Sequence, residues 1–203
     1  MSLESWIAFC ITETVLCFTP GPAVLLVVSF ALRRGVRPSL GAASGIIAAN
    51  TVYFALSAAG VAAVLLASRE LFVAVKWTGA SYLVWLGLRL ILSSSDTTPH
   101  VSSDLMRRAF LRGFLVQGAN PKAIAFFVAL LPQFLDTGRP LAPQLVMLAA
   151  SSVVIEFIAL FSYAKAASGA GRMAGPRVVR WLERAGGALL IGAGARLAAV
   201  RPE

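Results

Sequence analysis

The chain has 203 residues, of which 58% are hydrophobic and 13% are charged, and its formal net charge is +9. Soluble domains have about 45–50% apolar and 25% charged residues, so this composition excludes an ordinary soluble protein. Six apolar runs of roughly 22–29 residues fill most of the chain, and about 20 residues suffice to cross the hydrocarbon core of a bilayer. The runs are Leu3–Phe30, Ser39–Ala67, Leu71–Leu92, Phe110–Phe134, Leu141–Ala164 and Val178–Val200. We therefore predict an all-α integral membrane protein with six transmembrane helices.

The first run is interrupted by the sequence Pro20-Gly21-Pro22. A proline inside a helix removes a donor and clashes with the carbonyl four residues earlier, at a cost of about 3 kcal/mol. The carbonyls of Leu16 and Phe18 therefore lose their helical donors. At membrane depth such groups are tolerated only where protein or a water-filled cavity surrounds them. The break predicts a polar cavity within the membrane.

The second run contains Gly41 and Gly45, four residues apart, and the polar Asn50. Small residues at this spacing are typical of membrane helices that pack closely together. After the third run, the segment Ser93–Asp104 is rich in serine, threonine, aspartate and proline and has the composition of a linker. It divides a single domain into a first three-span repeat (1–92), a linker (93–109) and a second three-span repeat (110–203).

The fourth run repeats the pattern of the first, because Asn120-Pro121-Lys122 interrupts it. The sixth run repeats the third: "GGALLIGAGARL" (186–197) aligns with "GASYLVWLGLRL" (79–90) and keeps two glycines, an arginine and a leucine in place. Three spans per half force the second half into the opposite orientation. Inverted repeats with interrupted helices are typical of secondary transporters that bind their substrates near the midplane. The alternative is a chance similarity between glycine-rich apolar helices.

The basic residues are distributed unevenly if the six spans alternate. Most of the 18 lysines and arginines then fall on one side, in the loops after the first, third and fifth runs. Positive residues collect on the cytoplasmic side of a membrane, so both termini are expected outside and the linker around His100 inside. The same charges are dispersed over three loops without interleaved aromatic residues, which argues against a nucleic-acid partner.

These segments together strongly resemble the LysE/RhtB family of bacterial amino-acid exporters. The similarity runs from Glu13 to about Leu197 and is carried by "TPGPAVLLVV", "ALRRG", "GAASGIIAAN", "GASYLVWLGLRL" and "FLRGFLVQGANPKAIAFFVALLPQF". The resemblance implies export of amino acids or close derivatives across the bacterial cytoplasmic (inner) membrane, driven by the proton gradient. It implies a transporter and not an enzyme. The sole histidine, His100, has no partner at metal-ligand spacing, so no metal site is expected, and no cofactor is expected either.

The resemblance also carries candidate substrate-binding residues over to this sequence. One candidate is Asn50, in a region where the family often has an acidic or polar residue; its amide side chain does not ionise. The other candidates are the family's signature positions Pro20, Gly21, Pro22, Asn120, Pro121 and Lys122.

Three ionisable side chains fall deep within the predicted spans: Glu13, Lys122 and Glu156. Charges within the membrane are costly and therefore suggest a function. We expect Lys122 to pair with a substrate carboxylate, the alternative being a structural salt bridge to Glu13 or Glu156. Either glutamate is a candidate for the coupled proton, the alternative for each being a hydrogen bond between helices.

Two other functions have a similar six-span plan. A cation exporter would bring several carboxylates or thiolates together, and two acids with one lysine make a poor cation cage. A membrane thiol relay needs cysteines near both breaks, whereas Cys10 and Cys17 both lie in the first run. The expected partners are thus an amino acid, protons and the lipid bilayer. The identity of the amino acid, the coupling stoichiometry and the choice between monomer and homodimer stay open.

Overall fold

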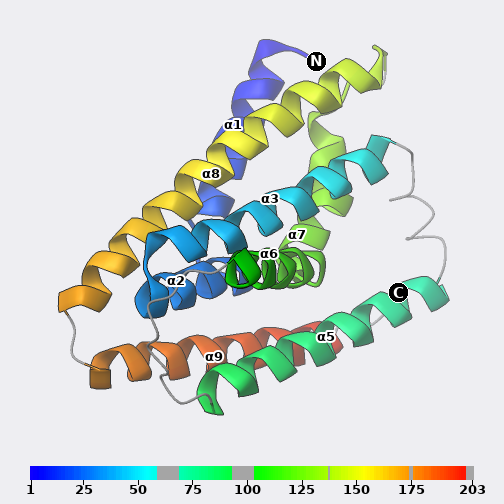
Figure 1. Ribbon diagram of the computed structural model, residues 1–203. Helices are drawn as coiled ribbons and strands as arrows, with labels where there is room; N and C mark the ends of the chain where they lie inside the picture. The colour runs from blue at the N-terminus through cyan, green and yellow to red at the C-terminus, as the bar shows by residue number, and fades with distance from the viewer. Residues whose placement is uncertain (59–68, 93–102, 137, 174–175, 200–203) are drawn as a thin grey trace.

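The computed structural model describes residues 1–58, 69–92, 103–136, 138–173 and 176–199, and these form helices joined by short turns (Figure 1). The predicted all-α fold is confirmed for this part of the chain. The helices are α1 (Leu3–Cys17), α2 (Pro22–Arg34), α3 (Val36–Ala58), α5 (Arg69–Leu92), α6 (Ser103–Gly118), α7 (Pro121–Ala125), η1 (Phe126–Leu130), η2 (Leu131–Phe134), α8 (Leu141–Met173) and α9 (Pro176–Ala199).

The first run is broken where the prolines predict it. Helix α1 ends at Cys17, α2 begins at Pro22, and the two helices are bent by 53°. Gly21 is the extended N-cap residue of α2, and Pro22 follows it in the first turn. A proline there costs no hydrogen bond, because the first N–H groups of a helix have no partner within it. The motif Pro20-Gly21-Pro22 therefore both ends α1 and starts α2.

The fourth run is broken in the same way, between α6 and α7, with a bend of 50°. The side chain of Asn120 caps α7 by accepting a hydrogen bond from the backbone N–H of Lys122 at 3.1 Å. Helix α7 is a short α-helix, and a π-helix (η1) and a 3-10 helix (η2) follow it. Pro132 in η2 lacks the N–H that the carbonyl of Val128 would accept in a continuous α-helix, which explains this departure.

The structure supports a membrane protein but does not by itself give six spans. Within the described residues, α3 and α8 are each long and apolar enough to cross a bilayer, and each bent pair would add one span. Helices α5 and α9 cover the third and sixth runs with 24 residues each, without meeting the same standard of apolar composition. The second run continues into residues 59–67, which lie outside the described residues. Six spans and their inverted arrangement therefore stay predictions.

Two helices are longer than the sequence suggested. Helix α6 begins at Ser103, inside the stretch assigned to the linker, and α8 continues to Met173 instead of ending near Ala164. An apolar run marks only the part of a helix that crosses the hydrocarbon core. The helix itself can continue into water, because its backbone hydrogen bonds do not require apolar side chains. Arg107 and Arg108 are exposed in this extra part of α6. Residues 93–102 of the predicted linker lie outside the described residues.

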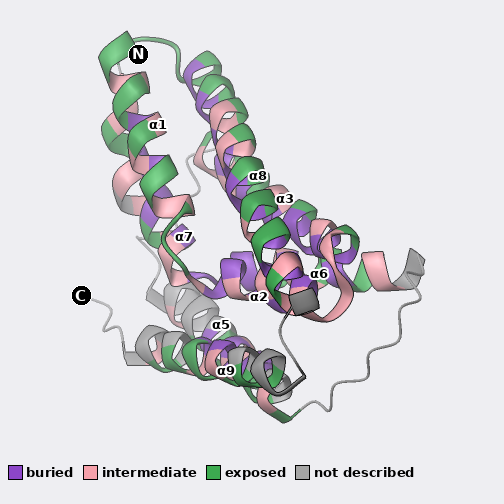
Figure 2. Cartoon of the chain, turned by 90° about the vertical axis from the view of Figure 1, so that its left-hand side faces the viewer, coloured by how far each residue is buried: buried purple, intermediate pink, exposed green. Residues whose placement is uncertain are grey.

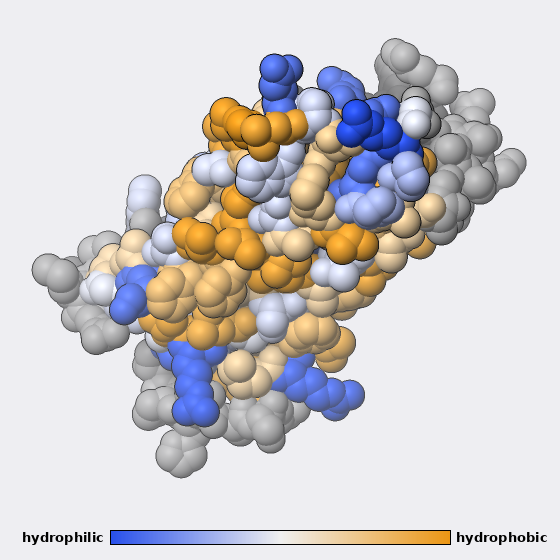
Figure 3. Space-filling view, turned by 90° about the horizontal axis from the view of Figure 1, so that it is seen from above, coloured by the Kyte–Doolittle hydropathy of each residue, from blue (hydrophilic) through white to orange (hydrophobic). Residues whose placement is uncertain are grey.

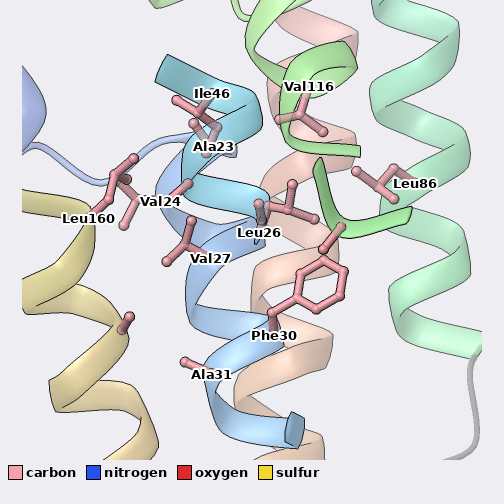
Figure 4. Close-up of a cluster of buried hydrophobic side chains, with 14 of the residues drawn as sticks. Ala23, Val24, Leu26, Val27, Phe30, Ala31, Ile46, Leu86, Val116 and Leu160 are labelled. Carbon is pink, nitrogen blue, oxygen red and sulfur yellow. The ribbon is translucent and has the colours of Figure 1, made fainter. Parts of the chain in front are cut away.

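Helix α2 lies at the centre of the bundle. Figure 4 shows its apolar side chains surrounded by residues of four other helices. The buried cluster includes Val24, Leu26, Val27 and Phe30 of α2 with Ile46 of α3, Leu86 of α5, Val116 of α6 and Leu160 of α8. In a membrane, van der Waals packing of this kind favours association, because lipid tails are as apolar as leucine. This packing fixes the position of the first break.

Helices α3 and α6 pack with their backbones in contact. A Cβ atom built on Gly45 would lie 2.0 Å from the carbonyl oxygen of Phe110, and one on Gly113 would lie 2.0 Å from that of Ala42. A Cβ on Gly41 would lie 3.0 Å from the carbonyl oxygen of Met106. The predicted close packing at Gly41 and Gly45 is therefore confirmed.

The outer faces of the bundle are apolar. Leu3, Ile7, Ile11 and Val15 recur every four residues along α1 and are all exposed. In Figure 2 the outward turns of α1 and α8 are exposed, while their buried residues face neighbouring helices. Figure 3 shows hydrophobic side chains across the middle of one face and hydrophilic ones toward its edges. Such a surface suits a lipid environment.

Candidate functional site

A cavity lies where the two helix breaks meet, as the proline motifs predict. Its volume is about 40 Å³, which is room for a few water molecules. The cavity brings together Glu13, Gly21, Asn50, Asn120, Lys122 and Glu156 of the predicted site residues. Pro20, Pro22 and Pro121 do not line it but form the adjoining breaks. Its wall also includes Leu16, Cys17, Ala23, Val24, Gln117, Ala123, Phe126, Phe127 and Leu160.

At the first break, the carbonyls that the prolines leave without helical donors have found other partners. The ammonium group of Lys122 donates to the carbonyl oxygen of Leu16 at 2.7 Å. The hydroxyl group of Tyr163 on α8 donates to the carbonyl oxygen of Phe18 at 2.8 Å. A backbone group without a partner is costly at membrane depth, so both side chains stabilise the break.

The second break is satisfied in a similar way. The backbone N–H of Asn120 donates to the carbonyl oxygen of Gln117 at 3.0 Å, in a tighter turn than that of an α-helix. The hydroxyl group of Tyr53 on α3 donates to the carbonyl oxygen of Gly118 at 2.8 Å. Each break therefore depends on a tyrosine from a helix elsewhere in the bundle.

Lys122 uses its ammonium group on backbone oxygens. Besides the bond to Leu16, Nζ donates to the carbonyl oxygen of Thr19 at 2.9 Å. Among the described residues no ion pair joins Lys122 to Glu13 or Glu156. The salt bridge considered as an alternative from the sequence is therefore not present in this structure. The ammonium group instead lies at the C-terminal end of α1, where the helix dipole is negative.

Glu156 is held by a chain of amide side chains that starts at the second break. Asn120 accepts from the backbone N–H of Lys122 and donates through Nδ2 to Gln117 Oε1 at 2.9 Å. Gln117 Nε2 donates to Asn50 Oδ1 at 2.8 Å, and Asn50 Nδ2 donates to Glu156 Oε2 at 2.7 Å. A backbone N–H can only donate, so it fixes the direction of every later amide in the chain. The chain ends by presenting a donor to Glu156.

Glu13 has a different partner. Ser152 Oγ on α8 donates to Glu13 Oε1 at 2.6 Å, and both side chains are buried. Glu13 and Glu156 thus each make a hydrogen bond between helices, which the sequence left as an alternative, and both also line the cavity. The described charged groups in the cavity wall are two carboxyl groups and one ammonium group.

Several residues of the site were missed in the sequence. Gln117 and Ser152 are buried and complete the hydrogen bonds of the two acids, and Cys17 lines the cavity beside them. Tyr53 and Tyr163 close the breaks. One available signal was the position of Gln117, which lies three residues before Asn120 in an apolar run and hence on the same helix face. The other residues lie on different helices, so no local spacing connects them to the breaks.

We expect Gln117→Leu to destabilise the protein. The substitution leaves Asn50 Oδ1 and Asn120 Nδ2 buried without their partner, and each such group costs about 1–3 kcal/mol. The free energy of unfolding in detergent or bicelles should fall by about 2 kcal/mol or more. Gln133→Leu makes the same chemical change at an exposed position outside the cavity wall and should cost less, because groups that it leaves without a partner can reach solvent. Equal stability of the two variants would contradict the structural importance of the amide chain.

The comparisons with known proteins concern the sequence of the whole chain. A family model described as "LysE type translocator" matches residues 14–200. An uncharacterized membrane protein of Vibrio cholerae is 33% identical over 204 residues, which cover 99% of this chain and all of the relative. No solved structure matches the chain significantly.

Two further relatives have names that state an activity. A homoserine/homoserine lactone efflux protein of Salmonella typhimurium is 29% identical over 204 residues, covering 99% of both chains. A leucine efflux protein of Klebsiella pneumoniae is 30% identical over 135 residues, covering 65% of this chain and 64% of the relative.

Proposed function

The chain belongs to the LysE type translocator family, and on that basis we propose that it exports amino acids or close derivatives across the cytoplasmic membrane in exchange for protons. Members of a translocator family are transporters and not enzymes. The relatives named for efflux of homoserine, homoserine lactone and leucine support this substrate class. Homoserine and leucine share an ammonium group and a carboxylate, whereas homoserine lactone keeps the ammonium group and has an ester in place of the carboxylate.

One structural observation carries the proposal: two broken helices meet at a cavity that contains two carboxyl groups and an ammonium group. An amino acid presents the complementary groups, since its ammonium group suits carboxylates and backbone carbonyls and its carboxylate suits an ammonium group. In this proposal Lys122 receives the substrate carboxylate. Glu13 or Glu156 binds the proton that moves inward.

The proposal includes the arrangement in the membrane. Six spans form two inverted repeats, both termini face the periplasm, and the segment 93–109 faces the cytoplasm. The similar bends of the two broken helices, 53° and 50°, agree with such a repeat. Repeats related in this way can expose a central site to either side in turn by rocking against each other.

The test is transport by the purified protein in liposomes. Vesicles are loaded with L-homoserine, L-homoserine lactone, L-leucine, L-threonine or L-lysine, and the outer buffer is then made acidic. We expect at least one compound to leave faster than from protein-free vesicles, and a protonophore to remove the acceleration. Release no faster than from protein-free vesicles for every compound would overturn the proposed export. Release that ignores the pH gradient would overturn proton exchange alone.

A further inference from the structure

The C-terminal end of α1 forms a binding site for an ammonium group. The carbonyl oxygens of Leu16 and Thr19 lie 2.7 Å and 2.9 Å from Nζ of Lys122. The Leu16 carbonyl loses its helical donor because Pro20 has no N–H. It accepts from the backbone N–H of Thr19 at 3.1 Å and has a second lone pair for an ammonium group. The Thr19 carbonyl lies in the break itself. Two backbone oxygens at the negative end of a helix are well suited to hold a cation.

Gly21 and two carboxyl groups lie around these oxygens. A Cβ atom on Gly21 would lie 3.6 Å from Nζ of Lys122, which is an ordinary van der Waals contact with the ammonium group. Glu13 and Glu156 line the same cavity, and each accepts a hydrogen bond from a residue other than Lys122. The carboxyl groups therefore favour positive charge in the cavity without holding the lysine in place.

We propose that the carbonyl oxygens of Leu16 and Thr19 bind the ammonium group of the substrate, and that Lys122 occupies this site when the substrate is absent. This inference rests on the proposed function and adds the position of the amino group. The lysine and the substrate carry the same primary ammonium group, so the same oxygens serve both. The flexible four-carbon stem of Lys122 lets its ammonium group withdraw when the substrate binds. The released ammonium group then pairs with the substrate carboxylate.

Two kinds of ligand distinguish this exchange. An amino acid displaces the ammonium group of Lys122 and then pairs with it through its carboxylate. An amine without a carboxylate, such as a lactone or an amino alcohol, displaces the ammonium group without forming an ion pair with it. Lys122→Met keeps most of the stem and removes the competing ammonium group, so it acts on the two kinds of ligand in opposite directions.

The experiment measures the dissociation constants of matched pairs, L-homoserine with L-homoserine lactone and L-leucine with L-leucinol, on the full-length protein in lipid nanodiscs. If Lys122 fills the site about nine-tenths of the time, Lys122→Met should tighten lactone or leucinol binding by about tenfold. Binding of the corresponding amino acid should weaken by about tenfold or more, because a charge-assisted bond is lost. Lys165→Met is the matched control, since Lys165 is exposed and its ammonium group lies over the ring of Phe161.

Unchanged or weaker binding of both amine ligands in Lys122→Met overturns the inference. The export proposal survives that result if the liposomes still release an amino acid. Failure of all four ligands to bind either protein, together with no release in the liposome assay, overturns both.

A second measurement uses the wild-type protein and therefore tests the inference even if Lys122→Met does not fold. In the wild-type protein with ¹⁵N-labelled lysine, leucinol should speed hydrogen exchange at Nζ of Lys122, because the ammonium group leaves the carbonyl oxygens. Lys122→Arg identifies the signal. Unchanged exchange with saturating leucinol overturns the inference.

Discussion

Gly45→Ala is expected to prevent stable folding, although it adds a single methyl group. A Cβ atom at Gly45 would lie 2.0 Å from the carbonyl oxygen of Phe110, and it would also meet the backbone nitrogen of Phe114 at 2.8 Å. Backbone atoms cannot rotate away as a flexible side chain can, so α3 and α6 have to separate along their contact. Overpacking alone costs about 1–3 kcal/mol, and we expect the loss here to reach or exceed the upper end. The yield of monodisperse protein and its thermal unfolding in detergent measure the effect.

The chain provides a control with the same chemical change. No heavy atom lies within 4 Å of a Cβ atom built on Gly169 in α8. Gly169→Ala should therefore fold at least as well as the wild type, since alanine is the better helix former by about 1 kcal/mol. Wild-type stability of Gly45→Ala would contradict the close approach of α3 and α6.

If Glu13 or Glu156 carries the proton, its replacement by glutamine is expected to abolish the acceleration of export by a pH gradient. The two variants to compare are Glu13→Gln and Glu156→Gln. A glutamine fits both positions, because its amide oxygen can accept from Asn50 Nδ2 or Ser152 Oγ as the carboxylate does. It cannot take up and release a proton. Export in the gradient should then fall to the rate seen without one, while exchange of substrate across the membrane continues. Liposome efflux and counterflow measure the two rates.

The control for this pair is Glu4→Gln, because Glu4 is exposed in the first turn of α1. It should keep both gradient-driven export and exchange. If the two variants and their combination all keep full gradient-driven export, neither glutamate carries the proton. Loss of exchange as well as export would place the substituted residue in substrate binding.

The breaks could be predicted from the sequence because their cause is local. Pro20, Pro22 and Pro121 each remove one donor four residues after a carbonyl, and this holds whatever the surrounding helices do. The close packing at Gly41 and Gly45 follows from the same kind of local pattern. The start of α6 at Ser103 was not predictable from apolarity, since the helix continues past the part of the sequence that suits lipid.

The partners of the ionisable groups could not be predicted because they depend on which helices meet. An apolar span with one lysine gives no sign that its ammonium group reaches the end of another helix, as Lys122 does at α1. From the sequence, Lys122 was expected to pair with a substrate carboxylate, and a salt bridge to Glu13 or Glu156 was the alternative. In the structure, two backbone oxygens provide its hydrogen bonds, while Ser152 and Asn50 provide those of the acids.

The two broken helices differ in stiffness although their motifs correspond. Beyond the first break, α2 is a regular α-helix from Pro22 to Arg34, and such a helix is stiff along its whole length. Beyond the second break, a short α-helix passes into a π-helix and then a 3-10 helix, each with its own hydrogen-bonding register. Such a segment bends within itself, because hydrogen bonds in these registers are weaker than in a continuous α-helix. We therefore expect α2 to transmit a displacement at Pro22 along the bundle, and the segment from Pro121 to Phe134 to absorb one close to the cavity.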